Sequence, residues 1–273
     1  MDRLSEKEKN LEERLRRMGS VLIAFSGGVD SSYLLYVAHR VLGERAEAVT
    51  MRIATVPTRE GREAEKFCRT YGISQRVITV NQFIIPGFSE NPPDRCYRCK
   101  KFLFQNLKEL AARDGFPFVA DGTNADDTKE YRPGLAALAE LGIVSPLCEA
   151  GLSKEEIREL SRRAGLPTAD RPSFACMATR FPYGAKITAE GLLRVETAED
   201  FLYAHGFTQF RVRVHGDLAR IEVPEADLAR LLEWRNEIVK AFSEIGFLYV
   251  TMDLAGFRSG SMDEGRERSG VSG

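Results

Sequence analysis

The chain has 273 residues, which fits one large domain or one domain with a smaller one attached, and 43% of them are hydrophobic, enough for a packed core. Lysine and arginine total 39 against 40 aspartate and glutamate, giving a formal net charge of −1. A protein that holds long nucleic acid by electrostatics is usually more basic, so this balance disfavours a nucleic-acid partner. No run of about 18 apolar residues occurs, and we therefore expect no membrane partner.

The N-terminal residues 1–18 carry Leu4, Leu11 and Leu15 at helical spacing among many charges. This pattern predicts an amphipathic helix rather than a signal peptide, and we expect a cytoplasmic protein whose thiols stay reduced. The cysteines are then core residues, ligands or nucleophiles, not a disulfide set. Cys68 lies on the apolar stripe of a predicted helix and Cys148 follows Pro146-Leu147, so both are expected to be structural.

Short apolar runs alternate with amphipathic stretches from residue 20 to about residue 170. Strands are predicted over 21–25, 46–53, 76–80 and 116–120, and helices over 31–42, 60–71, 100–113 and 153–164. The last helix opens with Ser153-x-x-Glu156, which is typical of a capping box. Such alternation predicts an α/β fold with a doubly wound parallel sheet and helices on both faces.

The pattern changes after a loop rich in proline, alanine and serine at residues 166–184. Helices are predicted over 188–205 and 225–245, and strands over 209–214, 220–223 and 247–254. These elements predict a smaller α+β domain with a largely antiparallel sheet. We therefore expect one domain over 1–184, a second over 185–258 and a flexible tail over 259–273.

The string Ser26-Gly27-Gly28-Val29-Asp30-Ser31-Ser32 connects the first strand to the first helix after it. Two glycines allow a sharp turn, and the N–H groups that follow face an anion at the helix N-terminus. The three serines add hydroxyl groups, and Asp30 is placed to hold magnesium or orient the loop. The lysine of a Walker loop is missing. The string resembles the PP-loop ATP-pyrophosphatases, which implies cleavage of ATP between the α and β phosphates.

Cys96-Tyr97-Arg98-Cys99 is expected in a loop just before a helix that starts near Lys100, where nearby cations favour the thiolate. Alone, this spacing is compatible with zinc, a redox pair or an iron–sulfur cluster. Cys176 lies in the loop before the second domain. Three cysteines in loops that could face one sheet edge favour a [4Fe–4S] cluster with three protein ligands and one open iron. Zinc is the main alternative, but it prefers four ligands and neither loop contains histidine.

Taken together, the motifs resemble the LarE-type ATP-dependent sulfur transferases, which help to make the nickel-pincer nucleotide cofactor of lactate racemase. The resemblance runs in order over nearly the whole chain. The matching strings are Ser26-Gly-Gly-Val-Asp-Ser-Ser32, Asn91-Pro-Pro-Asp-Arg-Cys-Tyr-Arg-Cys-Lys-Lys101, Asp121-Gly-Thr-Asn-Ala-Asp-Asp127, Tyr131-Arg-Pro-Gly134, Ser145-Pro-Leu147, Ala175-Cys176 with Arg180, Pro182-Tyr-Gly184, and Arg211-Val-Arg213 ahead of Arg220-Ile-Glu-Val-Pro224.

The resemblance implies a specific reaction. A pyridinium mononucleotide with two carboxylates is adenylated with ATP and Mg²⁺, releasing diphosphate, and sulfur then displaces AMP to give a thiocarboxylate. In some members a cysteine that matches Cys176 gives up its own sulfur, leaving dehydroalanine. Members with the CxxC pattern instead carry a [4Fe–4S] cluster and pass on a bound sulfide, and the CxxC here favours this version. The implied partners are sulfide or a sulfide-delivering protein and further copies of the chain in a homo-oligomer.

Residue roles follow from the same resemblance. Catalytic residues are Cys176, Asp30 and Arg180; the cluster ligands are Cys96, Cys99 and Cys176; the ATP site comprises Ser26, Gly27, Gly28, Asp30, Ser31, Ser32, Gly122 and Thr123; and the substrate is bound by Arg211 and Arg213. Paired arginines suit phosphate and carboxylate groups. The main alternative is a tRNA thiolase of the PP-loop class, which would be expected to carry a basic RNA-binding face. A glutamine- or ammonia-using synthetase and a non-catalytic nucleotide sensor are the others.

Overall fold

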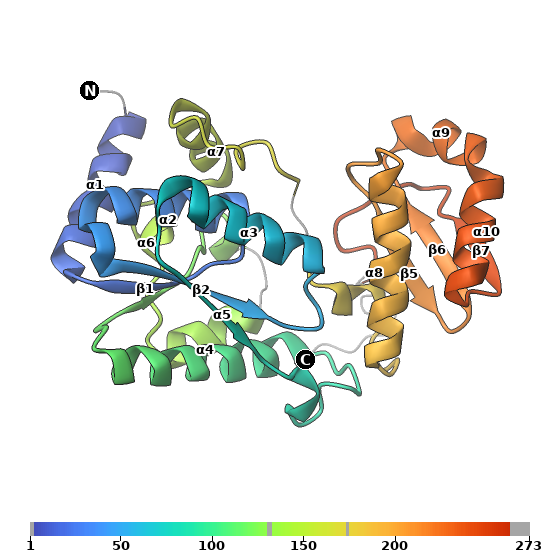
Figure 1. Cartoon of the computed structure of the whole chain (residues 1–273), viewed down its shortest axis with the longest axis horizontal. Coiled ribbons are helices and arrows are strands. Elements are labelled where there is room, and N and C mark those ends of the chain that lie inside the picture. The colour runs from blue at the N-terminus through green and yellow to red at the C-terminus, as the bar shows by residue number, and fades with distance from the viewer. Residues whose placement is uncertain (1–2, 130–132, 173–174, 263–273) are drawn as a thin grey trace. The chain divides into compact units, whose positions relative to one another are not determined.

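The computed structural model describes residues 3–129, 133–172 and 175–262. The chain divides into two compact units (Figure 1): Met1–Phe88 with Asp94–Phe174, and Ser89–Pro93 with Ala175–Gly273. The boundary therefore falls before the expected 184/185 division, and a short segment from the first half joins the second unit. No helix in the described ranges is long and apolar enough to cross a membrane.

The first unit is built on a four-stranded parallel sheet in the order β3-β2-β1-β4. Its strands are β1 (Val21–Ala24), β2 (Ala46–Arg52), β3 (Gln75–Thr79) and β4 (Val119–Ala120). A single parallel bridge from Ala120 to Val144 extends the sheet beyond β4. The predicted α/β class and parallel sheet are confirmed.

Both faces of this sheet are covered, because alternate residues of β1 enter different cores. Val21 and Ile23 belong to one core and Leu22 to the other. Figure 1 shows α1, α2 and α3 over one face and α4 and α5 over the other. The helices of this unit are α1 (Arg3–Met18), α2 (Val29–Leu42), α3 (Thr58–Tyr71), α4 (Arg95–Asp114), α5 (Pro133–Glu140), α6 (Pro146–Glu149) and α7 (Lys154–Arg163).

The start of α4 corrects one expectation. The helix begins at Arg95, not near Lys100, so the CxxC motif forms its first turn instead of a preceding loop. Pro93 disfavours helical backbone at the residue before it, Pro92, so the helix is expected to begin only after this point. The Arg98 backbone N–H then donates to the Asp94 carbonyl at 3.1 Å, closing the first helical turn.

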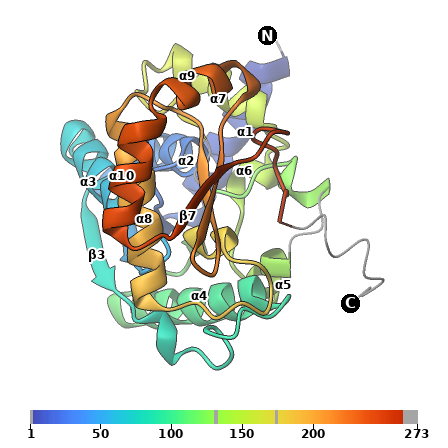
Figure 2. The same cartoon turned by 90° about the vertical axis from the view of Figure 1, so that its right-hand side faces the viewer.

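The second unit contains a three-stranded sheet in the order β5-β6-β7. Its elements are β5 (Arg211–His215), β6 (Leu218–Glu222), β7 (Tyr249–Met252), α8 (Ala189–Ala204), α9 (Leu228–Glu233) and α10 (Arg235–Ile245). β5 and β6 are antiparallel, whereas β6 and β7 are parallel. Figure 2 shows α8 and α10 packed side by side. The single helix expected over 225–245 is divided at Trp234.

Two further segments complete this unit. Within Ser89–Pro93, the buried Asn91 side chain donates to the carbonyls of Phe181 and Pro182 at 3.3 and 2.7 Å. Backbone N–H groups of Gly184 and Ile187 donate to Asn91 and Ser89 in return, at 3.0 and 2.8 Å. At the other end of the chain, Ser261 is buried against the sheet, so ordered contacts extend into the segment expected to be a tail. Residues 263–273 of that tail lie outside the described residues.

Candidate active site

The phosphate loop follows β1, which lies between β2 and β4, and leads directly into α2. Gly27 has a φ of +76°, a left-handed conformation that favours glycine, and a Cβ there would lie 3.2 Å from the Cβ of Ala64. The hydroxyls of Ser26 and Ser31 are 3.0 Å apart, and Ser31 Oγ donates to the Gly28 carbonyl at 3.2 Å. The loop therefore exposes backbone N–H groups at a helix N-terminus, which is an anion site.

The outer side of the loop is held by Arg171, a residue that the sequence analysis did not select. One guanidinium nitrogen donates to the Gly27 carbonyl at 3.1 Å and another to Glu60 at 3.2 Å. Backbone carbonyls in a loop need donors from outside it, and Arg171 supplies one to Gly27. Burial raises the pKa of the Glu60 carboxyl, although Arg171 opposes this effect.

Gly122 approaches the loop from the end of β4. A Cβ at this position would lie only 2.9 Å from the Ser31 backbone nitrogen, so the close packing requires glycine. Next to it, the Thr123 hydroxyl donates to Asp121, and the Ser145 hydroxyl donates to the same carboxylate at 2.6 Å. Gly122 therefore packs against the loop, and the ATP-binding roles of Gly122 and Thr123 stay predictions. Tyr131, named in the resemblance, lies outside the described residues.

Asp30 lies in the first turn of α2 and forms an ion pair with Lys154, the first residue of α7, with 2.5 Å between Oδ2 and Nζ. Burial raises the pKa of the Asp30 carboxyl, and the ammonium of Lys154 acts against it. Within the described part of the chain, Asp30 Oδ1 and Ser32 Oγ are buried without a hydrogen-bond partner. An unsatisfied carboxylate oxygen and hydroxyl beside an anion loop fit a magnesium ion and a phosphate chain.

Lys154 was missed by the sequence analysis because its partner is distant in the chain. The predicted capping box is present, with Ser153 and Glu156 each accepting from the other's backbone N–H. This box fixes the start of α7 and so fixes Lys154. The signal in the sequence was a lysine directly after a cap, but only the packing of α7 against α2 brings it to Asp30.

The two cysteines of the CxxC motif are both half-buried in the first turn of α4, three residues apart and so on one helix face. Each sulfur has a nitrogen donor: Arg95 reaches Cys96 Sγ at 3.5 Å, and Gln82 reaches Cys99 Sγ at 3.1 Å. N–H donors favour sulfur that carries negative charge, and thiolate is the form that binds metals. The pair therefore fits two ligands of a cluster.

Cys176 belongs to the second unit, whereas Cys96 and Cys99 belong to the first. It is exposed and precedes a 3₁₀ turn, Met177–Arg180, with its carbonyl accepting from the Thr179 hydroxyl at 2.8 Å. Among the described residues, no three histidine, cysteine, aspartate or glutamate side chains are arranged to hold a metal ion. The three-cysteine ligand set stays a prediction.

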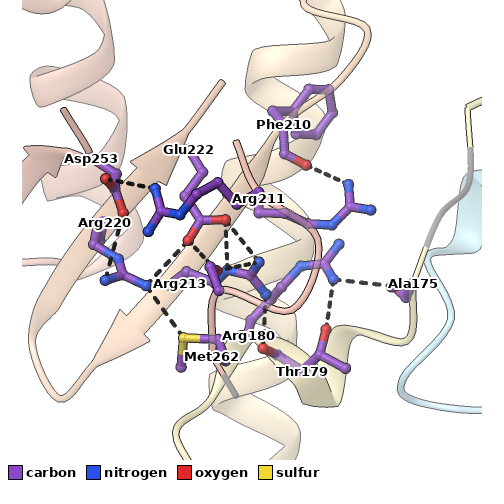
Figure 3. A network of polar contacts seen from close by, with 12 residues as sticks. Ala175, Thr179, Arg180, Phe210, Arg211, Arg213, Arg220, Glu222, Asp253 and Met262 are labelled. Atoms are coloured by element: carbon purple, nitrogen blue, oxygen red, sulfur yellow. Dashed lines mark hydrogen bonds and ion pairs between the residues drawn. The ribbon is translucent and has the colours of Figure 1, made fainter. Parts of the chain in front are cut away.

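Arg180 is the last residue of the turn that follows Cys176, and its side chain is buried. Figure 3 shows it contacting Ala175 and Thr179. Its guanidinium donates to both oxygens of Glu199 at 2.7 and 3.1 Å, and also to the Ala175 carbonyl at 3.2 Å. Burial acts to raise the pKa of the Glu199 carboxyl, but the charge and hydrogen bonds of Arg180 outweigh it and hold the pKa below 4.5. In this structure Arg180 shapes the backbone around Cys176 from within the protein.

Arg211 and Arg213 lie on β5 and are both buried. Arg213 donates to Glu222 at 2.7 and 3.0 Å and to the Thr179 carbonyl at 2.9 Å (Figure 3). Arg211 donates to the Phe210 carbonyl at 2.6 Å and stacks on Phe257, and burial lowers its pKa to about 10. Arg180 and Arg213 are therefore paired with Glu199 and Glu222, and the binding of an anionic substrate by Arg211 and Arg213 stays a prediction.

Comparisons with known proteins agree with this geometry. The family model for NAD synthase matches residues 4–109. An uncharacterized protein of Synechocystis sp. is 40% identical over 95% of this chain and 98% of its own length. The pyridinium-3,5-bisthiocarboxylic acid mononucleotide synthase of Lactiplantibacillus plantarum is 35% identical, over 97% of this chain and 96% of its own. An uncharacterized protein of Methanocaldococcus jannaschii is 33% identical over 95% and 98%.

Proposed function

Because this chain belongs to the family of the pyridinium-3,5-bisthiocarboxylic acid mononucleotide synthase, we propose that it is an ATP-dependent sulfurtransferase that converts the carboxylates of a pyridinium dicarboxylate mononucleotide into thiocarboxylates. The observation that carries this proposal is the identity of 35% over 97% of the chain, which includes both units. The phosphate loop without a Walker lysine supports it, since the reaction needs AMP transfer and not phosphate transfer.

The first half of the reaction is adenylation. A substrate carboxylate oxygen attacks the α-phosphorus of ATP, the bond to the bridging oxygen breaks, and diphosphate leaves. The loop N–H groups, Ser26 and Ser31 bind the departing diphosphate, and Asp30 would hold a magnesium ion, which would neutralise the charge of that group. Lys154 places a further positive charge at the same point. These groups stabilise charge that develops only as the bond breaks, which is what accelerates the step.

The second half is sulfur transfer. Cys96, Cys99 and Cys176 would hold a [4Fe–4S] cluster, and that group would supply an iron site able to carry sulfide. Arg180 fixes the backbone of Cys176 through the Ala175 carbonyl, and Arg211 and Arg213 orient the anionic groups of the substrate. Sulfur attack on the acyl carbon releases AMP, because AMP is a far better leaving group than oxide. In the competing route the Cys176 sulfur attacks, its Cβ–S bond breaks as the Cα proton leaves, and dehydroalanine remains.

The test uses anaerobically purified protein with ATP, Mg²⁺, sulfide and the pyridinium dicarboxylate mononucleotide. We expect AMP and diphosphate as nucleotide products and the thiocarboxylate by mass spectrometry, with unmodified tRNA left unthiolated as the control. Formation of ADP and phosphate would refute the PP-loop assignment. Several products per enzyme with bound iron support the cluster route. One product per enzyme, with a protein mass loss equal to H₂S, supports the sacrificial route.

The substrate role of the arginines has its own test. Arg211→Ala and Arg213→Ala should weaken binding of the mononucleotide more than binding of ATP, since both side chains lie in the second unit and the phosphate loop in the first. Calorimetric titration of each ligand separates the two effects. Equal loss of both affinities, or of neither, would count against a substrate clamp.

A further inference from the structure

A fully buried glutamine contacts the CxxC motif. Gln82 opens a 3₁₀ turn, Gln82–Ile84, that follows β3, and its side chain is 0% exposed. The turn is fixed locally, because the Asn81 side chain accepts the Phe83 backbone N–H at 3.0 Å and the Gln82 carbonyl accepts that of Ile85 at 3.1 Å. The backbone position of the glutamine is therefore fixed by hydrogen bonds within its own segment.

The direction of the Gln82 amide is determined by Thr55, in the segment after β2. Gln82 Oε1 accepts from the Thr55 backbone N–H at 3.1 Å and from its hydroxyl at 3.0 Å. A backbone N–H can only donate, so the oxygen end must face Thr55, and the NH₂ end must face Cys99. A flipped amide would bring two donors together in a buried place, which is strongly unfavourable. The bond from Gln82 Nε2 to Cys99 Sγ, at 3.1 Å, is thus fixed in sense as N–H to sulfur.

This contact has a chemical consequence for the sulfur. A neutral thiol is a weak acceptor, whereas a metal-bound thiolate carries negative charge and gains from a buried N–H donor. Hydrogen bonds to ligand sulfurs orient the ligand, strengthen metal binding and raise the reduction potential of iron–sulfur clusters. The donor to Cys96 is different in kind: it is the guanidinium of the adjacent Arg95, at 3.5 Å.

We propose that Gln82 is a positioning residue that holds Cys99 as a metal-bound thiolate and sets the reduction potential of the cluster bound through it. The proposal rests on the cluster of the proposed function and adds to it a residue from outside the ligand set. The backbone N–H of residue 55 fixes the direction of the amide, and the amide in turn holds the sulfur.

The experiment compares Gln82→Met and Gln82→Glu with Thr55→Val. Methionine has a similar length but no N–H donor, and glutamate keeps the shape but presents only acceptors when ionised. Thr55→Val removes the hydroxyl bond to Gln82 and keeps the backbone N–H that fixes the amide, so it is a matched control for altered packing. Circular dichroism and the unfolding temperature of each variant establish that it folds.

Each protein is reconstituted anaerobically with iron and sulfide. The readouts are the midpoint potential of the cluster, followed by electron paramagnetic resonance, and the affinity for iron in competition with a chelator. We expect a more negative potential and about 10- to 100-fold weaker iron binding in both Gln82 variants. Thr55→Val should match the wild-type protein in both measurements.

Wild-type potential and iron affinity in both Gln82 variants would overturn the proposal, as would a loss in Thr55→Val equal to that in Gln82→Met. A wild-type protein that takes up no iron would overturn both the proposal and the cluster route. Release of AMP and diphosphate by the same preparations reports adenylation independently, so failure of the proposed activity is seen separately.

Discussion

Removal of the Arg180 guanidinium tests how the second unit supports the backbone of Cys176. Arg180 and Glu199 are each 1% exposed, and two hydrogen bonds of 2.7 and 3.1 Å join them. Arg180→Met leaves the Glu199 carboxylate buried, with the Val212 backbone N–H still donating to it at 3.0 Å. Loss of one partner from a buried ion pair typically costs about 3–5 kcal/mol, because the other charge is left uncompensated. We expect the free energy of unfolding of this unit to fall by that amount.

The measurement uses Trp234, which is the chain's single tryptophan and lies in the second unit. Its fluorescence during urea unfolding reports that unit, and the midpoint and slope give the free energy. The control is Arg180→Met with Glu199→Gln, which removes both charges and should recover most of the loss. A single variant within 1 kcal/mol of wild type, or a double variant no more stable than the single, would refute this account of the pair.

The pH dependence gives the same prediction a sign. In the wild-type protein the pKa of Glu199 is lowered. The stability that this pair contributes is therefore present above pH 4.5, and it is lost as the pH falls through the lower pKa of Glu199 in the folded state. In Arg180→Met burial acts without the arginine and raises this pKa. The deficit of the variant should therefore shrink as pH falls, because Glu199 takes up a proton and its buried charge disappears.

Three further predictions concern the phosphate loop. Gly122→Ala places a methyl group 2.9 Å from the Ser31 nitrogen and should weaken ATP binding by about tenfold. The control Gly61→Ala, at an open helical position, should bind ATP as the wild type does. Equal ATP affinities of the two variants would refute the close approach. Burial raises the pKa of Asp30 above 3.8, so Mg²⁺-dependent ATP binding, measured by calorimetry, should already weaken as the pH falls toward 3.8. An affinity that does not change down to pH 3.8 would contradict this prediction. Lys154→Met should weaken the binding of ATP and diphosphate, but not of AMP, in the same assay. The control Lys7→Met, which breaks a 2.6 Å ion pair to the same helix, should change none of these affinities. An equal loss of AMP affinity in Lys154→Met would exclude a role in binding the phosphates that leave.

The parts of the fold that the sequence predicted well depend on local patterns. The apolar run that became β1 is buried on both faces, and this is the property that identifies a central parallel strand. The capping box at Ser153 needs only residues three positions apart, and it is present. The start of α4 was placed too late because no ordinary cap marks it: the Asp94 side chain makes no capping bond, and two prolines alone set the boundary.

The chemistry of the site was harder to predict where it depends on contacts between distant segments. Arg213 was predicted to bind the substrate, and that role stays a prediction. Its ion pair with Glu222, diagonally across β5 and β6, was not predicted, because the register that brings the two residues together is not visible in either strand alone. Lys154 and Gln82 were missed for the same reason, since each contacts its partner only after separate elements pack. A sequence motif can reveal the contacts of a titratable or amide side chain only when its partner is near in the sequence.

The segment Ser89–Pro93 has a consequence for the order in which the chain folds. Its Asn91 is separated from Phe181 by 90 residues. This segment of the second unit is therefore synthesised long before the residues that contact it. Closing a loop of that length has an entropic cost, and contacts of this kind slow folding. A fragment that starts at Ala175 would expose the carbonyls of Phe181 and Pro182 and leave the backbone N–H of Gly184 without its acceptor. The C-terminal unit is therefore a product of the whole chain, and excising it at any single point removes part of its structure.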